Sequence, residues 1–382
     1  MAEDRYVFET EWYDPQAELQ RKYLLTFYLK DNTIEMYDVK NHRMFLKRTC
    51  YPSVELSDLF IGARVTIFSR QLKLVQYGDV FTRKCLETRR SRTLALVKPD
   101  GYQKMGRILQ AAIDAGLIVS RVKMVRLAPQ DTADFCGAIP TYAQDSGVFD
   151  RAVQFMSSDV VVAIELVGQD AVATWKRIIG PDDPAQAKAQ SPQSLHASCG
   201  GEDVVQNAVH GSDSNEMARL ELEFFFDRKW QPTALVNHCS CAVIRPHAMR
   251  QAGHIIDDIL KAGFEVSAME LFQLNKQMAQ EFLEVYKTAL PEYSSLVEQM
   301  CSGPCLAMEI RQENAVQTFR DLVGPHDPDI ARALRPNTLR AKYGIDRVKN
   351  AVHCTDLPED GALEVEFFFS ILQQQQQQQQ GS

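Results

Sequence analysis

The sequence predicts an α/β (α+β) protein built from a small N-terminal β domain and two tandem copies of a mixed domain. Three observations support this prediction. The chain of 382 residues is too long for one compact core and long enough for two or three domains of ~100–200 residues each. A set of short motifs occurs twice, far apart in the chain. The first 85 or so residues alternate polar and apolar side chains, as half-buried strands do.

The composition excludes several classes of protein. With 45% hydrophobic and 24% charged residues, the chain is neither wholly disordered nor fibrous. No apolar run approaches the ~18 residues of a membrane-spanning helix, and the charged start at 1–5 lacks the apolar segment of a secretory signal. Nine thinly spread cysteines favour a reducing compartment over a disulfide framework. We therefore expect a cytoplasmic protein that does not engage a membrane.

Charge is distributed unevenly along the chain. The net charge of −8 disfavours binding to bulk nucleic acid, so no specific nucleic-acid partner is expected. Residues 1–92 nevertheless hold 16 Lys and Arg against 13 Asp and Glu. This basic excess has two explanations, a surface that meets an acidic polymer and a solvated face without a partner.

The first domain is expected over residues 1–88. Period-two alternation predicts four of its strands, over 23–29, 33–37, 64–68 and 72–75. The Asp31-Asn32 pair between the first two strands is typical of a hairpin turn. Residues 82–92, with five basic side chains, are expected to link this domain to the next.

The repeated domain is predicted at 93–227 and 239–371, with alternating strands and helices. Its copies open on short apolar strands at 94–97 and 242–244, each ended by an X-Pro step. A helical apolar pattern follows from Gly106 to Ala115. The other strands are predicted at 118–120, 160–166, 264–266 and 306–310, and as phenylalanine-rich closing strands at 221–226 and 364–369. Residues 227–238 are expected to join the copies, and 372–382 to be a disordered polyglutamine tail.

Each copy carries the same set of polar residues near its end. Asn207 precedes His210 by three residues, and a carboxylate follows eleven residues later at Glu221; the second copy repeats this spacing with Asn350, His353 and Glu364. An imidazole steadied by a carboxylate or hydroxyl is a competent nucleophile. Lysine and arginine side chains nearby suit a phosphate as its electrophile. The repeated pattern therefore predicts a phosphate site in the ancestral domain.

These motifs resemble those of the nucleoside diphosphate kinase family. The resemblance lies in Lys98-Pro99-Asp100 after the first strand, in the glycine-containing first helix, and in the run from Asn207 to Asp213. It covers 93–226 and 239–369, and the head resembles the DM-ten domain of ciliary proteins. The family implies a ferredoxin-like βαββαβ fold. It also implies a two-step relay in which a histidine takes the γ-phosphate of a Mg²⁺-bound nucleoside triphosphate and passes it to a nucleoside diphosphate.

The resemblance assigns roles to individual residues. The catalytic nucleophiles are His210 and His353. The nucleotide- and phosphate-binding residues are Lys98, Lys176, Asn207, Ser212 and Glu221 in repeat one, and Arg245, Arg320, Arg340, Asn350, Thr355 and Glu364 in repeat two. Glu221, supported by Ser212, would orient the imidazole of His210. No residue is assigned as a metal ligand.

Both repeats depart from the family pattern. In repeat one, the two family arginines fall on Lys176 and His196, the phosphate-binding threonine on Asp182, and the base-stacking phenylalanine on Val148. In repeat two, Arg245 replaces the lysine, His326 the threonine, Cys354 the glycine after the histidine, and Glu292 the stacking phenylalanine. Counting full positive charges favours tighter nucleotide binding by repeat two.

Three functions remain open on the sequence alone. The first is an axonemal or ciliary microtubule-associated protein with weak phosphohistidine-mediated phosphoryl transfer, for which tubulin or another axonemal protein is the expected partner. The second is a free cytoplasmic nucleoside diphosphate kinase that maintains triphosphate pools, and the third is a catalytically dead scaffold. In each case we expect the two repeats to pack against each other as an internal pseudo-dimer.

Overall fold

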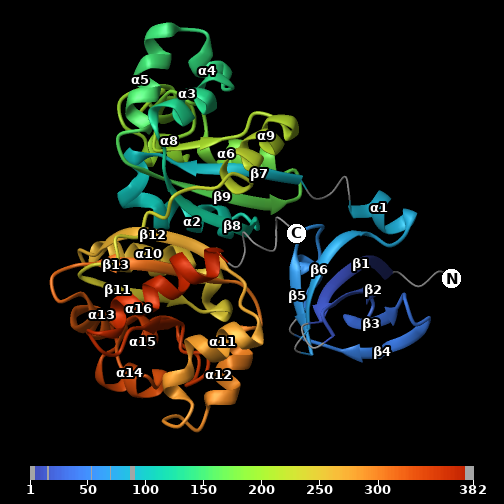
Figure 1. The fold of residues 1–382 in the computed structure, drawn as a ribbon. Coiled ribbons are helices and arrows are strands. Elements are labelled where there is room, and N and C mark those ends of the chain that lie inside the picture. Colours follow the sequence, from blue (N-terminus) through green and yellow to red (C-terminus); the bar gives the residue numbers. More distant parts are fainter. Residues whose placement is uncertain (1–4, 15–16, 53, 69, 87–90, 375–382) are drawn as a thin grey trace.

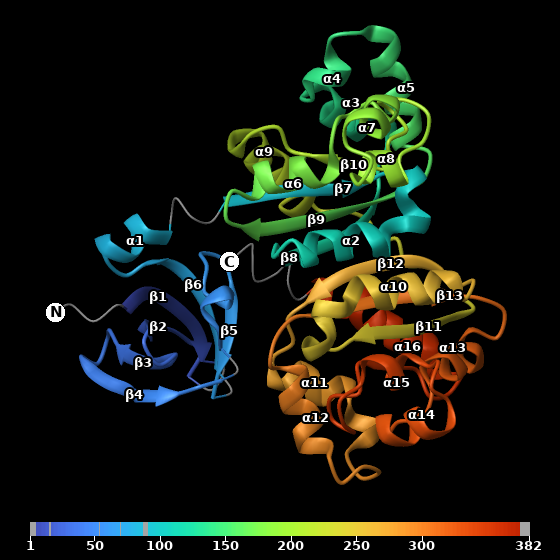
Figure 2. The same ribbon diagram turned by 180° about the vertical axis from the view of Figure 1, so that it is seen from behind.

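The computed structural model describes residues 5–14, 17–52, 54–68, 70–86 and 91–374, and this described part folds around two β-sheets. The head forms the first sheet, and the two repeats share the second (Figure 1). Seen from behind, the head lies beside repeat two, with the two repeats stacked on each other (Figure 2).

The head is an antiparallel sheet with strand order β4-β3-β2-β1-β6-β5. Its strands are β1 (Arg5–Asp14), β2 (Leu19–Tyr28), β3 (Thr33–Asp38), β4 (Arg43–Cys50), β5 (Arg64–Ile67) and β6 (Arg70–Tyr77), with η1 (Leu56–Asp58) before β5 and α1 (Val80–Leu86) at the end. The alternation in β3 buries Ile34 and Met36 on one face, as the sequence predicts. Asn32 turns the β2–β3 hairpin with a positive φ of 52°.

Repeat one contains four antiparallel strands in the order β10-β7-β9-β8, which is the ferredoxin-like arrangement that the sequence predicts. The strands are β7 (Ser91–Val97), β8 (Ile118–Arg126), β9 (Val160–Gly168) and β10 (Val209–Gly211). Its helical elements are η2 (Pro99–Lys104), α2 (Met105–Asp114), α3 (Pro129–Gly137), α4 (Pro140–Ala143), α5 (Ser146–Met156), α6 (Ala171–Ile179), α7 (Pro184–Gln190), α8 (Leu195–Cys199) and α9 (Asn215–Phe226).

Repeat two copies this arrangement with the order β12-β13-β11-β14. Its strands are β11 (Cys239–Ile244), β12 (Glu265–Phe272), β13 (Cys305–Arg311) and β14 (Val352–Cys354). Its helical elements are η3 (Pro246–Gln251), α10 (Ala252–Lys261), α11 (Lys276–Phe282), η4 (Glu284–Tyr286), α12 (Tyr293–Met300), α13 (Ala315–Val323), α14 (Pro328–Leu334), α15 (Leu339–Tyr343), α16 (Asp360–Glu366) and the π-helix η5 (Phe367–Leu372).

The two repeats join edge to edge as an internal pseudo-dimer. Strand β8 of repeat one lies next to β12 of repeat two, with Lys123 opposite Glu270, so that one eight-stranded sheet runs through both copies. On the helix face of α2 and α10, the buried side chains of both repeats form a single continuous core. On the opposite face each repeat has a core of its own, and these separate cores underlie the two candidate sites.

The expectation of phenylalanine-rich closing strands needs correction. The segments 221–226 and 364–369 are helical, in α9 and in α16 with η5, and are not closing strands. Ser214 accepts a hydrogen bond from Met217 N and so caps α9, and a helix can bury Leu222 and Phe225 together on its inner face. In a strand, residues three apart would lie on opposite faces.

The predicted connections are also partly corrected. Residues 82–86 belong to α1 and 91–92 to β7, so they are not linker, while 87–90 lie outside the described residues. Residues 227–238 contain no helix or strand and join the repeats as expected. Gln373 is buried and donates to Glu270, so the tract begins inside the fold; the tail at 375–382 lies outside the described residues. No helix in the described ranges is long and apolar enough to cross a membrane.

Candidate active site

His210 is fixed at the centre of repeat one by β10 and α9. Strand β10 pairs with β7, which places His210 opposite Leu96. Its Nε2 lies 2.9 Å from Glu221 Oε1, and Ser212 Oγ donates to Glu221 Oε2 at 2.5 Å. A ring whose Nε2–H is held by a carboxylate keeps its lone pair on Nδ1. The arrangement that the sequence predicts for these three residues is therefore present and leaves one nucleophilic nitrogen.

Lys98 is almost completely buried beside this histidine, with 1% of its surface exposed. Its Nζ donates to Asn207 Oδ1 at 2.5 Å, to Tyr142 OH at 2.7 Å and to Val205 O at 3.0 Å. These neutral partners hold the ammonium group without cancelling its charge. Tyr142, from the short helix α4, was missed by the sequence argument, because α4 lies outside the motifs that carry the family resemblance.

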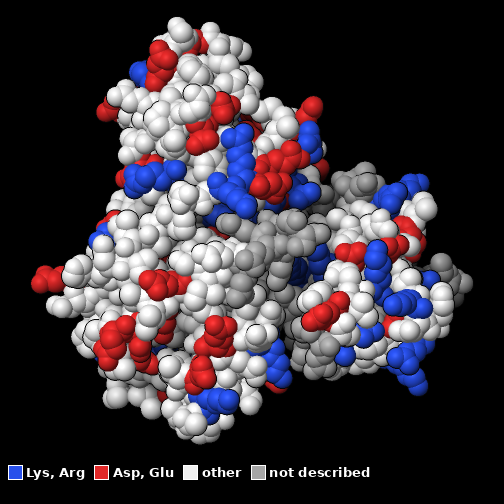
Figure 3. Space-filling model, in the orientation of Figure 1, with Lys and Arg blue, Asp and Glu red and all other residues white. Residues whose placement is uncertain are grey.

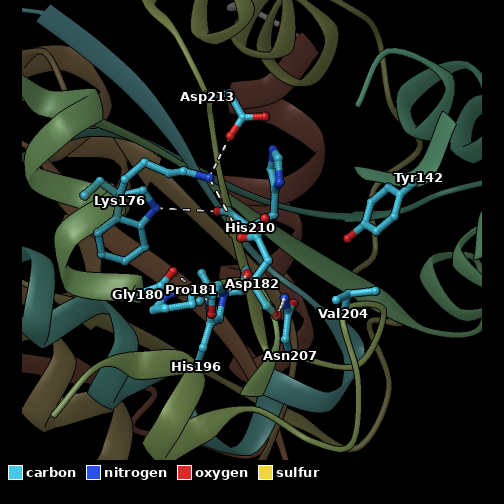
Figure 4. A network of polar contacts seen from close by, with 12 residues as sticks. Tyr142, Lys176, Gly180, Pro181, Asp182, His196, Val204, Asn207, His210 and Asp213 are labelled. Carbon is cyan, nitrogen blue, oxygen red and sulfur yellow. Dashed lines mark hydrogen bonds and ion pairs between the residues drawn. The ribbon is translucent and has the colours of Figure 1, made fainter. Parts of the chain in front are cut away.

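Lys176 projects from α6 into the same region, where two carboxylates hold it (Figure 4). Its Nζ lies 2.6 Å from Asp213 Oδ1 and 3.8 Å from Asp182 Oδ1. The signal for Asp213 was in the sequence, since an aspartate follows the hydroxyl residue in both repeats at Asp213 and Asp356. Its role as a lysine partner requires the fold.

His196 has a structural role. It is fully buried, and its ring nitrogens face the backbone oxygens of Pro181 at 2.7 Å and Val209 at 2.8 Å. Burial lowers its pKa, although both hydrogen bonds oppose the shift. In repeat two, Arg340 donates to the backbone oxygens of Gly324 and Val352, which match Gly180 and Val209; Nδ1 of His196 also lies 3.2 Å from the Gly180 oxygen. Both side chains therefore brace the strand that carries the nucleophile.

A pocket opens over these residues, and we call it the repeat-one pocket. Lys98, Ile139, Thr141, Tyr142, Lys176, Asp182, Val204, Asn207, Val209, His210 and Asp213 line it. Val148 does not line it and instead packs against the core of repeat one. The base-stacking position of the family is thus filled by a side chain that faces the protein interior.

Repeat two reproduces the histidine arrangement. His353 Nε2 lies 2.9 Å from Glu364 Oε2, and Thr355 Oγ1 donates to the same oxygen at 2.8 Å. The change from Gly211 to Cys354 is accommodated by a second change. A β-carbon on Gly211 would lie 2.5 Å from the ring of Trp175, and repeat two carries Phe319 at the equivalent position of α13.

The histidine of repeat two is nevertheless more deeply buried. Only 2% of the His353 side chain is exposed, against 10% for His210. The ring of Phe282 lies 4.7 Å from the His353 ring, centroid to centroid, and Tyr286 lies on the same side at 6.3 Å. Tyr286 OH donates to Asp356 Oδ2 at 2.5 Å, and Arg320 donates to the backbone oxygen of Asp356. His210 has an equivalent aromatic neighbour, Phe135, but its ring lies farther away at 5.8 Å, so the ring of His353 is the less accessible of the two.

Two cations of repeat two, Arg245 and Arg340, are buried close together. Arg245 donates to Val348 O at 3.0 Å, and burial together with the charge of Arg340 lowers its pKa to about 10. Asn350 Nδ2 lies 3.2 Å from His326 Nδ1, and burial together with Arg340 lowers the pKa of His326 to about 4. His326 is therefore neutral near pH 7.

Glu292, at the position of the family's base-stacking phenylalanine, has a different role in repeat two. Glu292 forms an ion pair with Arg347 at 3.6 Å and does not offer an aromatic face. Tyr286 and Phe282 are the aromatic groups beside His353.

Mg²⁺ fits the repeat-one pocket as a companion of the nucleotide. In the described part of the chain, no three His, Cys, Asp or Glu side chains gather as metal ligands. Asp182 and Asp213 nevertheless offer carboxylate oxygens beside the lysine, and Mg²⁺ is commonly held by one or two carboxylates together with substrate phosphates. These two residues would adjoin an ion that the nucleotide brings.

Most of the chain matches models of known protein families. Residues 91–230 and 238–373 match the family model described as nucleoside diphosphate kinase. Residues 1–88 match the one described as the N-terminal PH domain of nucleoside diphosphate kinase 7, where the sequence argument expected a DM-ten domain.

Individual relatives cover most of the chain. Nucleoside diphosphate kinase homolog 7 of Rattus norvegicus is 44% identical over 375 residues, which span 97% of this chain and 94% of the relative. Thioredoxin domain-containing protein 6 of Xenopus laevis is 34% identical over 282 residues, 73% of this chain and 43% of that protein. The solved nucleoside diphosphate kinase of Aquifex aeolicus aligns with 35% of this chain and 96% of its own, at 36% identity and a TM-score of 0.34.

Proposed function

We propose a function for this chain on the premise that it belongs to the nucleoside diphosphate kinase family. Repeat one transfers a phosphoryl group between nucleoside tri- and diphosphates through His210, and repeat two binds nucleotide poorly or not at all because its histidine is buried under aromatic side chains. The observation that carries this proposal is the difference in access. His210 lines a pocket with two lysines, whereas Phe282 and Tyr286 cover His353.

The residues of repeat one divide the reaction between them. Nδ1 of His210 attacks the γ-phosphorus, the N–P bond forms, and the bond from γ-phosphorus to the β-γ bridging oxygen breaks, so that the nucleoside diphosphate leaves. In the second half, a β-phosphate oxygen of another diphosphate takes the phosphoryl group and restores the imidazole. Glu221 holds Nε2–H and stabilises the positive charge that develops on the ring.

Charge stabilisation comes from the pocket lysines. Lys98, held by neutral partners, keeps its full charge for the phosphates, and Lys176 reaches them by exchanging a carboxylate for a phosphate oxygen. Mg²⁺, when bound with the nucleotide, neutralises part of the phosphate charge. Asn207 couples Lys98 to the loop at Asp182 and so keeps the pocket wall in register.

Counting positive charges in the sequence favoured nucleotide binding by repeat two. The accessibility of the two histidines in the structure favours repeat one instead. Repeat two holds more positive charge, but phosphoryl transfer requires the nucleophile to reach the phosphorus at about 3–3.5 Å. A ring packed against Phe282 meets that requirement only after the cover moves. We therefore assign the faster transfer to repeat one.

Incubation of the full chain with γ-labelled ATP and Mg²⁺ tests the assignment. We expect acid-labile, base-stable label on the wild-type chain and on His353→Ala, and its loss from His210→Ala. A His210→Ala chain that keeps most of its label would overturn the proposal. The two variants are matched to each other, because each removes one imidazole ring and both rings make the same contact with a glutamate.

We also propose that the chain is a microtubule-associated protein of the cilium or axoneme, with tubulin or another axonemal protein as partner. The resemblance of the head to ciliary domains supports this placement. Strand β4 adds a physical reason, because it forms an edge of the head sheet and exposes Arg43 and Lys47 to solvent. The head displays further basic groups in Figure 3.

Co-sedimentation with stabilised microtubules tests this second proposal. We expect the chain to pellet with microtubules at low salt, and the Arg43→Glu, Lys47→Glu double variant to remain in the supernatant. If the wild-type chain also stays in the supernatant, the free cytoplasmic kinase becomes the preferred function.

A further inference from the structure

Two carboxylates partner the exposed cation of the repeat-one pocket. Asp213 Oδ1 lies 2.6 Å from Lys176 Nζ, and Asp182 Oδ1 lies 3.8 Å from the same atom. Figure 4 shows Lys176 between these two side chains and beside His210. Of the charged side chains that line the pocket, two are lysines and two are aspartates, so the pocket is close to neutral while His210 is uncharged.

Comparison with repeat two shows which of the two carboxylates, Asp182 or Asp213, has no acidic equivalent there. Arg320 occupies the position of Lys176 and keeps the partner Asp356, which matches Asp213. At the position of Asp182, however, repeat two carries His326, whose lowered pKa leaves it neutral near pH 7. Asp182 is therefore a negative charge beside the phosphate site that the sister repeat lacks.

The fold holds Asp182 in place at the pocket wall. Its backbone oxygen accepts a hydrogen bond from Asn207 Nδ2 at 2.7 Å, and Asn207 in turn bonds Lys98. The next residue, Asp183, caps α7 by accepting from Ala185 N at 2.9 Å. The loop is thus anchored on both sides, which keeps the backbone of Asp182 at the pocket wall.

We propose that Asp182 makes repeat one selective for nucleotides complexed with Mg²⁺, by competing with phosphate for Lys176. The inference rests on the proposed function of repeat one and names the form of the nucleotide that it accepts. An uncomplexed triphosphate must take Lys176 from Asp182 and then remain near a carboxylate, which repels it. A phosphate chain that carries Mg²⁺ has a lower negative charge and presents a cation to the same carboxylate.

The size of the effect follows from the exposure of the pair. Side-chain exposures are 31% for Lys176 and 42% for Asp182, so solvent and salt screen their interaction. One carboxylate at this distance is then expected to weaken binding of the free nucleotide by about tenfold, and binding of the Mg²⁺ complex by much less.

Titration of the full-length chain with a fluorescent, non-hydrolysable ATP analogue tests the inference. Each protein is titrated once in excess EDTA and once in excess Mg²⁺. Asp182→Asn removes the charge at nearly constant shape, and Asp182→Glu keeps the charge. Asp150→Asn is the matched control, because Asp150 is exposed on α5 and does not line the pocket. Thermal melts of all four proteins check that the fold is unchanged.

The expected result is a change in selectivity. Asp182→Asn should bind the analogue about tenfold tighter than wild type in EDTA and less than about threefold tighter in Mg²⁺. Asp182→Glu and Asp150→Asn should behave as wild type. If Asp182→Asn binds the analogue equally more tightly in both buffers, or no more tightly in either, the inference is overturned. Binding of the analogue by the wild-type chain in Mg²⁺ would still support the proposed function. Absence of binding by every protein in both buffers overturns both.

Discussion

Gly106 and Gly253 face each other where α2 of repeat one crosses α10 of repeat two. A β-carbon on Gly106 would lie 2.5 Å from the backbone oxygen of Gly253 and 2.6 Å from Asp257 N. A β-carbon on Gly253 would meet the backbone oxygen of Gly106 in the same way. Helices can approach this closely only without side chains at the crossing point, so these glycines set the distance between the repeats.

We therefore predict that Gly106→Ala destabilises the chain by about 2–3 kcal/mol, because backbone atoms of both helices must move apart. Urea unfolding monitored by circular dichroism measures the change. Gly137→Ala is the control: Gly137 ends α3, and its new β-carbon would meet only Phe149 Cε2, at 3.9 Å. The control should be neutral or slightly stabilising, and a Gly106→Ala chain as stable as the control would contradict the packing argument.

The cover over His353 makes a chemical prediction. Diethylpyrocarbonate should modify His210 several-fold faster than His353, because the ring of His353 is packed against Phe282 and almost fully buried. Phe282→Leu shortens the covering side chain and should raise the modification rate of His353 about fivefold. Peptide mass spectrometry measures both sites in one sample, so the rate at His210 is the internal control. An unchanged rate at His353 in the variant would show that Phe282 is not the barrier.

The sequence predicted the duplicated architecture and most strands, because apolar runs ended by proline or glycine carry a strong local signal. It failed for the phenylalanine-rich segments. Glu221, Leu222 and Phe225 are all buried in α9, and a short apolar run alone does not distinguish a strand from a helix that packs against the sheet. The N-cap at Ser214 was the available signal for a helix.

The site was predictable only as far as its motifs extend. His210, Ser212 and Glu221 follow from spacing and family resemblance, and the structure joins them directly. Access does not follow from such motifs. The cover of His353 comes from Phe282, about 70 residues earlier in the chain, and only the packing of α11 against β14 and η5 brings it there.

The connection between the repeats is held by a buried carboxylate. Glu309 on β13 accepts hydrogen bonds from Leu235 N at 2.7 Å, from Val236 N at 2.6 Å and from Ser267 Oγ at 2.6 Å. Glu165, the matching residue of repeat one, instead pairs with Arg121. The glutamate at this position of the sheet thus binds the segment that joins the repeats in repeat two, and an arginine in repeat one.

Glu309→Gln should accordingly loosen this connection. The amide keeps one acceptor but turns a donor toward a backbone N–H, so we expect a loss of about 2–4 kcal/mol in unfolding free energy. Limited proteolysis should also cut 227–238 faster than in wild type. Glu313→Gln, at an exposed position soon after β13, is the control and should change neither measurement. Normal stability and protease resistance in Glu309→Gln would mean that the carboxylate is dispensable.

The half-buried imidazole of His326 predicts a dependence of stability on pH. Burial and the nearby charges of Arg340 and Arg245 lower its folded-state pKa to about 4, against ~6.5 in an unfolded chain. The unfolded state therefore binds the proton more readily, so the stability contributed by the neutral ring is complete above about pH 6.5 and is lost as the pH falls towards 4. We expect a loss of roughly 1–2 kcal/mol in unfolding free energy, less than the full pKa shift implies because the ring is partly accessible to solvent.

Urea unfolding at about pH 7 and about pH 4.5 measures this loss. It should be smaller for His326→Asn than for wild type. His254→Asn, which removes an exposed histidine of α10, should match wild type. An equal loss in all three proteins would place the acid sensitivity elsewhere in the chain.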